Sequence, residues 1–186
     1  MKVKKAQVLE GELSHARLSG MDYADAYACE FECRHEVTAD DLQIAFWTDF
    51  PPVVGKLFKL RDWVVKPFGI QTGGGSQKEK DKEAFEACIR QGGKFRFFSV
   101  AGKLADETML ELEDKHLRCF LSLKVTALDE RHKSVKATTL VKFHNTLGRA
   151  YFFVIRPFHC RVVGAMLKHV IGRLSQAQPG PTNTLT

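Results

Sequence analysis

The sequence predicts an α+β fold in which a curved antiparallel sheet wraps around a long C-terminal helix. The first observation is the order of the elements: one strand, two short helices, a run of strands with short connections, and a final helix ending near Leu174. The second is that this final helix is apolar on almost every side, so it must be buried on more than one face. One sheet that carries its helices on one face satisfies both observations.

The composition narrows the class of protein. A chain of 186 residues, 44% of them hydrophobic, is enough for one globular domain with a substantial core. The net charge of +6 is dispersed, and the densest charge run, residues 78–83, alternates in sign. Nucleic-acid binders cluster their basic residues on one face, so we expect no nucleic-acid partner.

The location of the protein is also constrained by sequence. The N-terminus has basic residues but lacks the apolar stretch of a secretory signal. No run of about 18 uncharged apolar residues occurs, so we expect no stable membrane insertion and a cytoplasmic location.

The cysteines predict reduced thiols rather than disulfides or a metal site. They are odd in number, lie in apolar segments and form no CxxC pair: Cys29, Cys33, Cys88, Cys119 and Cys160. On a strand, Cys29 and Cys33 would lie about 13 Å apart, which is too far for one zinc ion even with His35 nearby. We therefore expect neither a metal nor a cofactor.

The N-terminal half begins without a pattern and then becomes regular. Residues 1–20 are expected to be an N-terminal arm. Residues 27–34 alternate between apolar and charged side chains, which predicts a half-buried strand. Thr38 and Asp41 resemble a capping box that opens a helix. Pro51-Pro52 starts a second helix, whose apolar residues recur at helical spacing up to Gly69.

The following segments complete the predicted domain, residues 21–176. Residues 71–82 are glycine-rich and then highly charged, and are expected to form a flexible loop. A helix is predicted over 81–91. Strands are predicted over 95–101, 108–113, 116–127 and 136–144, in an antiparallel meander. Residues 177–186 are expected to be a disordered tail.

The apolar faces of the predicted strands and of the final helix identify the core. Leu121, Leu123, Val141 and Phe158 lie at the centre of the apolar faces, so all four are expected to be buried. Pro157 removes a backbone donor inside the final helix and is expected to kink it.

Three motifs carry a family resemblance: DKHLR at 114–118, HNTLGRAY at 144–151 and IRPFH at 155–159. Together they make residues 23–174 resemble the bacterial family called domain of unknown function 2867. The element order resembles the helix-grip fold of the START/Bet v 1-like (SRPBCC) superfamily. That resemblance implies a hydrophobic cavity between the sheet and the long helix, and it implies no established activity.

The candidate site residues lie at one end of the predicted cavity between the sheet and the final helix. His116, His144 and His159 are the candidates for acid/base chemistry, although such histidines more often form structural hydrogen bonds. Arg118, Arg149 and Arg156 are the candidates for binding an anionic group with two parallel hydrogen bonds, and the alternative for them is ion pairing with Glu111, Glu113 or Asp114. Apolar candidates for the cavity wall are Tyr151, Phe158, Leu121 and Phe143.

The leading functional hypothesis is the binding of a small hydrophobic or amphipathic molecule between the sheet and the final helix. A cyclase- or aromatase-like enzyme on the same fold is one alternative, and two titratable groups about 3 Å apart would favour it. An interaction module that uses the final helix, with a possible homodimer, is another, and an exposed apolar patch on that helix would favour it.

Overall fold

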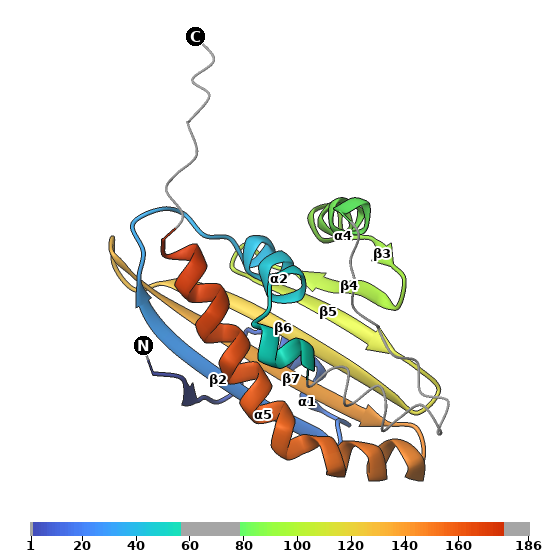
Figure 1. The fold of residues 1–186 in the computed structure, drawn as a ribbon. Helices are drawn as coiled ribbons and strands as arrows, with labels where there is room; N and C mark the ends of the chain where they lie inside the picture. Colours follow the sequence, from blue (N-terminus) through green and yellow to red (C-terminus); the bar gives the residue numbers. More distant parts are fainter. Residues whose placement is uncertain (1, 57–78, 177–186) are drawn as a thin grey trace.

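The structure is a computed structural model and describes residues 2–56 and 79–176. Its centre is a seven-stranded antiparallel sheet in the order β1-β2-β7-β6-β5-β4-β3, with one long helix lying across its concave face (Figure 1). This confirms the predicted α+β fold with a curved sheet around a C-terminal helix. The elements are β1 Lys4–Lys5, α1 Leu13–Leu18, β2 Tyr23–Glu32, α2 Ala39–Thr48, α4 Glu79–Gln91, β3 Lys94–Phe95, β4 Phe98–Lys103, β5 Glu107–Glu113, β6 Leu117–Ala127, β7 His132–Phe143 and α5 Thr146–Leu174.

Helix α2 begins where its capping box predicts. The Thr38 hydroxyl accepts a hydrogen bond from the Asp41 backbone at 3.1 Å, and the Asp41 carboxylate accepts one from the Thr38 backbone at 3.2 Å. Buried Gln43 then donates to the backbone oxygens of Thr108 and Leu121, which fixes α2 on the sheet. Of the second predicted helix, residues 52–56 are helical and the remainder lies outside the described residues.

Helix α4 and the first strands of the meander differ from the predicted boundaries. The predicted flexible loop lies mostly outside the described residues, and α4 already begins at Glu79. The strand predicted over 95–101 is split into β3 and β4 by a tight turn, in which Arg96 has a φ of 55°. A left-handed residue other than glycine was not foreseeable from the apolar pattern of that segment. The predicted tail, 177–186, lies outside the described residues.

The concave face of the sheet holds the main core. Leu121, Leu123 and Val141 are all buried, as predicted, and Leu121 and Leu123 pack in one cluster with side chains of α2 and of the second half of α5. Cys29 and Phe31 of β2 extend this cluster. The alternation of apolar and polar residues therefore placed the inner face correctly on β2, β6 and β7.

Of the expected N-terminal arm, residues 13–18 form α1, which covers part of the convex face, and residues 4–5 form β1, which pairs with β2. Phe120, which breaks the alternation of β6, is buried beneath this helix together with Met109 and Leu140. The α1 backbone is held through Leu13, whose N–H donates to the buried Glu107 carboxylate at 2.9 Å. A helix of six residues is too short for helical spacing to reveal it in a sequence.

Helix α5 changes direction near Pro157, which confirms the predicted kink (Figure 1). After the bend, its apolar side chains enter the core: Val163, Met166, Leu167, Val170 and Ile171. On the first half of α5, Phe153, Val154 and Phe158 are exposed. The prediction that Phe158 is buried is therefore wrong, because the bend leaves only one side of the first half of α5 facing the sheet.

Candidate functional site

A row of polar side chains on β2 faces α5. Tyr23, Asp25 and Tyr27 alternate along the strand, so they share the concave face with Cys29 and Phe31. The antiparallel register places Asp25 opposite Thr139 of β7. Helix α5 adds His159 and Cys160 just after its bend. These six residues, Tyr23, Asp25, Tyr27, Thr139, His159 and Cys160, are called the Asp25 cluster.

Asp25 is the centre of this cluster and is only 7% exposed. Its Oδ2 accepts a hydrogen bond from the Tyr23 hydroxyl at 2.6 Å, and the Cys160 thiol lies 3.9 Å from the same oxygen. His159 Nε2 lies 3.6 Å from Asp25 Oδ1 and 3.2 Å from Thr139 Oγ1. A separation of 3.6 Å is an ion-pair distance rather than a hydrogen bond, so Oδ1 has no hydrogen-bond partner among the described residues.

The electrostatics keep Asp25 charged and the tyrosines neutral. Burial acts to raise the pKa of Asp25, but the His159 contact, with the Tyr23 and Thr139 hydroxyls, outweighs it and holds that pKa below its ordinary value. Burial, followed by the Asp25 contact, raises the pKa of Tyr23. Burial, followed by the Cys160 contact, raises the pKa of Tyr27. Both phenols therefore remain hydrogen-bond donors around a carboxylate at neutral pH.

Aromatic rings form one wall beside the cluster. The Phe152 ring lies 4.7 Å from that of Tyr23, 5.5 Å from that of Phe143 and 6.2 Å from that of His159, measured between centroids. The Arg156 guanidinium lies 5.2 Å from the centre of the Tyr23 ring. The site thus combines an anionic, hydrogen-bonding end with an apolar aromatic side.

The arrangement supports proton chemistry as well as binding. Both contacts of His159 use Nε2: in the tautomer protonated there, the ring donates to Thr139 Oγ1 and lies at ion-pair distance from Asp25. That tautomer leaves the Nδ1 lone pair to act as a base, while the carboxylate stabilises the imidazolium once it forms.

Two of the three predicted histidines have structural roles instead. The backbone oxygen of His116 accepts a hydrogen bond from the His144 backbone N–H at 2.9 Å. The His116 ring lies 3.3 Å from the side chain of Asn145, the N-cap of α5. His144 Nε2 lies 3.3 Å from the Glu113 carboxylate. Gly148 completes this junction, since a Cβ there would come within 2.2 Å of the His116 oxygen. The HNTLG motif therefore fastens the start of α5 to the start of β6.

The three predicted arginines do not converge. Arg118 points from β6 to the convex face, where it pairs with Glu111 and Glu113 at 2.9 and 2.8 Å. Those carboxylates line a cleft of about 430 Å³ on that outer face, together with Lys94, Arg96, Phe97 and Ser99.

The other two arginines are on α5. Arg149 lies 3.5 Å from Asp22 and over the Phe143 ring at 5.6 Å. Only Arg156 adjoins the Asp25 cluster.

The predicted apolar wall is also divided. Leu121 belongs to the closed core, and Phe158 is exposed. Phe143 contacts the aromatic wall through Phe152. Tyr151 is partly exposed on the first half of α5. Of the ten predicted site residues, His159 is a member of the Asp25 cluster, and Arg156 and Phe143 lie beside it.

Sequence reasoning missed five members of the Asp25 cluster: Tyr23, Asp25, Tyr27, Thr139 and Cys160. A signal was present: Asp25 stands in YADAY, on the same face as the apolar Cys29 and Phe31. An acidic residue that continues an inward-facing row is a candidate buried functional group. Among the described residues, no group of three or more His, Cys, Asp or Glu side chains has the geometry of a metal site.

Comparison with known proteins identifies a family but no activity. No curated protein matches the chain, and no solved structure matches it. The family model described as protein of unknown function (DUF2867) matches residues 17–166, which contain every member of the Asp25 cluster. Because this match spans most of the chain, the protein belongs to the DUF2867 family.

Proposed function

We propose that this protein binds a small amphipathic molecule where α5 crosses β2 and β7, with the Asp25 cluster holding its polar end. The observation that supports this most strongly is the Asp25 carboxylate, which is buried with one oxygen lacking a hydrogen bond among the described residues. A buried acceptor without a hydrogen bond costs free energy, so such groups are rare in native structures unless a ligand or water satisfies them.

The charge at this end selects the kind of ligand. Asp25 is an acceptor when ionised, and its pKa is held below the ordinary value. The matching group on a ligand is a donor, such as a hydroxyl or an amine. The rings of Phe152, Tyr23 and Phe143 supply the apolar contact for the rest of the molecule.

Arg156 is the predicted arginine that we place at this site. Its guanidinium lies over the Tyr23 ring, at the rim of the cluster, so it is positioned to contact a ligand without entering the buried end. Arg118 is on the other face of the sheet, and we propose no ligand contact for it.

The experiment is native mass spectrometry of protein purified from its own host, followed by binding measurements with whatever small molecule is retained. Asp25→Asn should reduce the retained ligand at least tenfold, because a charge-assisted hydrogen bond contributes roughly 1.5–3 kcal/mol. Asp106→Asn is the matched control, since Asp106 is a partly exposed carboxylate paired with Lys124 on the opposite face. Equal ligand content in the wild type and Asp25→Asn would refute the proposal.

A second candidate function is acid/base catalysis on the same molecule. It is favoured by the 2.6 Å contact between Tyr23 and Asp25, two titratable groups at hydrogen-bonding distance, with His159 beside them. The test incubates the retained molecule with wild type and with His159→Gln, and follows its mass. Conversion by the wild type, with binding but no conversion by His159→Gln, would establish an enzyme. An unchanged mass in both samples would show that the protein binds the molecule without converting it.

A further inference from the structure

The first half of α5 exposes an apolar face that the rest of the fold does not use. Phe153 is 77% exposed, Val154 58% and Phe158 50%. At about 100° per residue these three side chains share the side of the helix opposite the buried Phe152, and exposed Pro157 lies between them. Val154 and Phe158 are neighbours four residues apart, as are Phe153 and Pro157, and such an exposed apolar face is uncommon unless something covers it.

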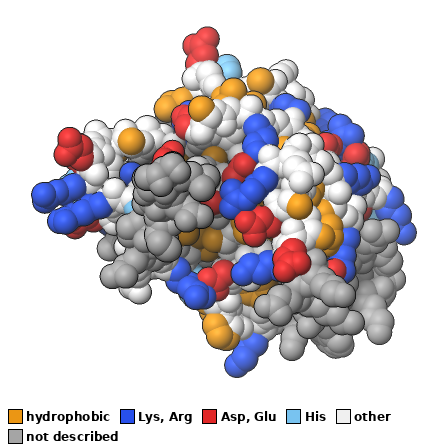
Figure 2. Space-filling model, turned by 90° about the horizontal axis from the view of Figure 1, so that it is seen from above, with side chains coloured by type: hydrophobic (Ala, Val, Ile, Leu, Met, Phe, Trp, Pro, Cys, Tyr) orange, Lys and Arg blue, Asp and Glu red, His pale blue; other side chains and the backbone are white. Residues whose placement is uncertain are grey.

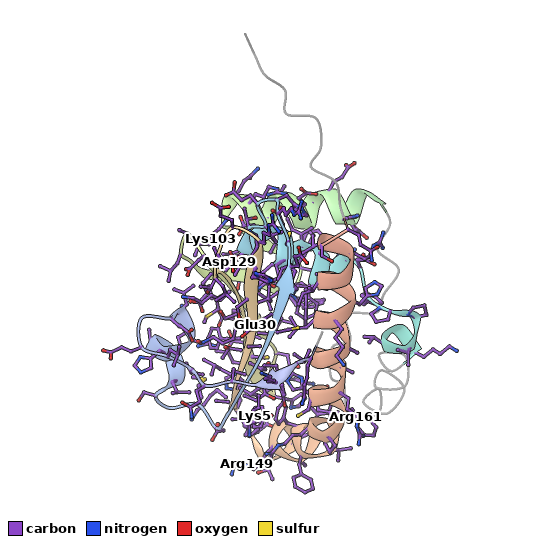
Figure 3. All side chains as sticks on the ribbon, turned by 90° about the vertical axis from the view of Figure 1, so that its left-hand side faces the viewer. Lys5, Glu30, Lys103, Asp129, Arg149 and Arg161 are labelled. Carbon is purple, nitrogen blue, oxygen red and sulfur yellow. The ribbon has the colours of Figure 1, made fainter. Side chains whose placement is uncertain are left out.

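The charges that α5 itself contributes around this face have one sign. Helix α5 contains no Asp or Glu over its 29 residues, whereas Arg149, Arg156 and Arg161 lie along its first half and around the bend. Figure 3 shows Arg149 at the first turn and Arg161 on the side of the helix away from the sheet. By contrast, the face of the molecule in Figure 2 interleaves basic and acidic side chains. Within α5, the charged residues beside the apolar face are thus all basic, although Arg149 also lies 3.5 Å from Asp22, just before β2.

The length and hydropathy of α5 point in the same direction. By length and composition it is long and apolar enough to cross a membrane, and only 22% of its most apolar stretch is buried. A spanning arrangement conflicts with the fold, because Val163, Leu167 and Ile171 of its second half form the core. The exposed first half alone remains for contact with lipid.

We propose that the first half of α5 docks on the surface of an anionic lipid bilayer. Phe153, Val154 and Phe158 enter the boundary between headgroups and acyl chains, as the apolar side of an interfacial helix does. Arg149, Arg156 and Arg161 contact the lipid phosphates, which their guanidinium groups bind with paired hydrogen bonds. The helix lies in the plane of the surface and does not cross it.

A second copy of the chain fits this face less well. A symmetric dimer would bring two helices without acidic residues together, and their arginines would face one another. An anionic surface satisfies both the apolar residues and the arginines. Arg156 is shared with the proposed ligand site. Phe153, Val154, Phe158 and Arg161 take no part in that site, so variants of these residues test the membrane contact independently of the proposed ligand.

The test is co-sedimentation of the full chain with phosphatidylcholine vesicles and with vesicles that also contain phosphatidylglycerol. We expect binding to the anionic vesicles only, with affinity that falls as salt is added. Phe153→Ser with Phe158→Ser should weaken the partition at least tenfold, because two aromatic side chains are no longer buried. Leu128→Ser is the control, since Leu128 is 53% exposed but lies in the β6–β7 turn.

The charge requirement has its own pair of variants. Arg161→Glu should lower the affinity roughly fivefold or more, whereas Arg131→Glu, an exposed charge next to β7, should leave it unchanged. Equal binding to both kinds of vesicle, or an equal loss in Leu128→Ser, would overturn the proposal. Absence of vesicle binding, with a dimer in sedimentation velocity that the phenylalanine variants abolish, would assign the face to a second copy instead.

Discussion

Asp25 of β2 and His159 of α5 lie 3.6 Å apart, just beyond the point where α5 bends. This contact joins the second strand of the sheet to the last helix of the chain, and Tyr23 and Thr139 complete it from two neighbouring strands. It gives the Asp25 carboxylate an imidazole at ion-pair distance on one side and a phenol donor on the other. The stability of the fold and the chemistry of the site therefore both depend on Asp25.

The pH dependence of stability should reveal this carboxylate. Its pKa is lower in the folded protein than its ordinary value of 3.8, so its ionisation stabilises the folded state above that pH. As the pH falls below about 4 and through the lower folded pKa, this contribution is lost. The free energy of unfolding of wild type minus that of Asp25→Asn should therefore decrease between pH 5 and pH 2, measured by urea unfolding. Parallel pH profiles would show that Asp25 titrates normally.

The core prediction concerns Leu123, which is fully buried between β6 and α5. Leu123→Ala should lower the free energy of unfolding by roughly 2–5 kcal/mol, because it removes buried methyl groups and leaves a cavity. Leu104→Ala, at an exposed position, should change it by less than about 0.5 kcal/mol. Similar losses in both variants would contradict the observed facing of β6.

The junction at the start of α5 can be tested with two glycines of the same helix. Gly148→Ala would place a methyl group 2.2 Å from the His116 oxygen and should cost roughly 1–3 kcal/mol. Gly164→Ala meets no atom within 4 Å and should stabilise the helix by about 0.5–1 kcal/mol. Thermal melting compares the pair directly, and a shift in the same direction for both would argue against the close contact.

Much of the fold could be predicted because it depends on local patterns. Thr38 and Asp41 fixed the start of α2, and the alternation on β6 and β7 fixed the inner face. Phe120 looked like an exception because the helix that buries it, α1, is too short to leave a periodic signal. Phe158 could not be placed, since an apolar residue on a helix has the same spacing whether it meets the sheet or solvent.

The site was harder to predict than the fold because its members meet only through tertiary pairing. Asp25 and Thr139 face each other because of the register between β2 and β7, which a single sequence does not reveal. The predicted strand began at Tyr27, so Tyr23 and Asp25 fell outside it. His159 was recognised as a candidate, but without Asp25 its role had no physical basis. The three arginines were expected to lie together, but Arg118 does not join the others. On β6 the odd-numbered residues face the core and the even-numbered ones, including Arg118, face outwards.

Arg118 should prove structural. Arg118→Met unpairs Glu111 and Glu113 on the convex face, which should lower the free energy of unfolding by about 0.5–1 kcal/mol because the pairs are partly exposed. Ligand affinity should stay unchanged, since the sheet separates Arg118 from the Asp25 cluster. Isothermal titration with the retained ligand measures the second quantity, and a tenfold loss of affinity would place the site on the wrong face.

In the proposed function, Asp25 binds the hydrogen-bond-donating end of an amphipathic molecule. The most direct measurement is the affinity of decylamine, decanol and decanoate for the wild type and for Asp25→Asn, by isothermal titration at neutral pH. We predict that the amine and the alcohol bind the wild type at least tenfold more tightly than decanoate, because the ionised acid is repelled by the buried carboxylate. Asp25→Asn should remove that preference. Tighter binding of decanoate, or equal binding of all three by the wild type, would contradict the account and return the ligand-binding role to Arg149 and Arg156.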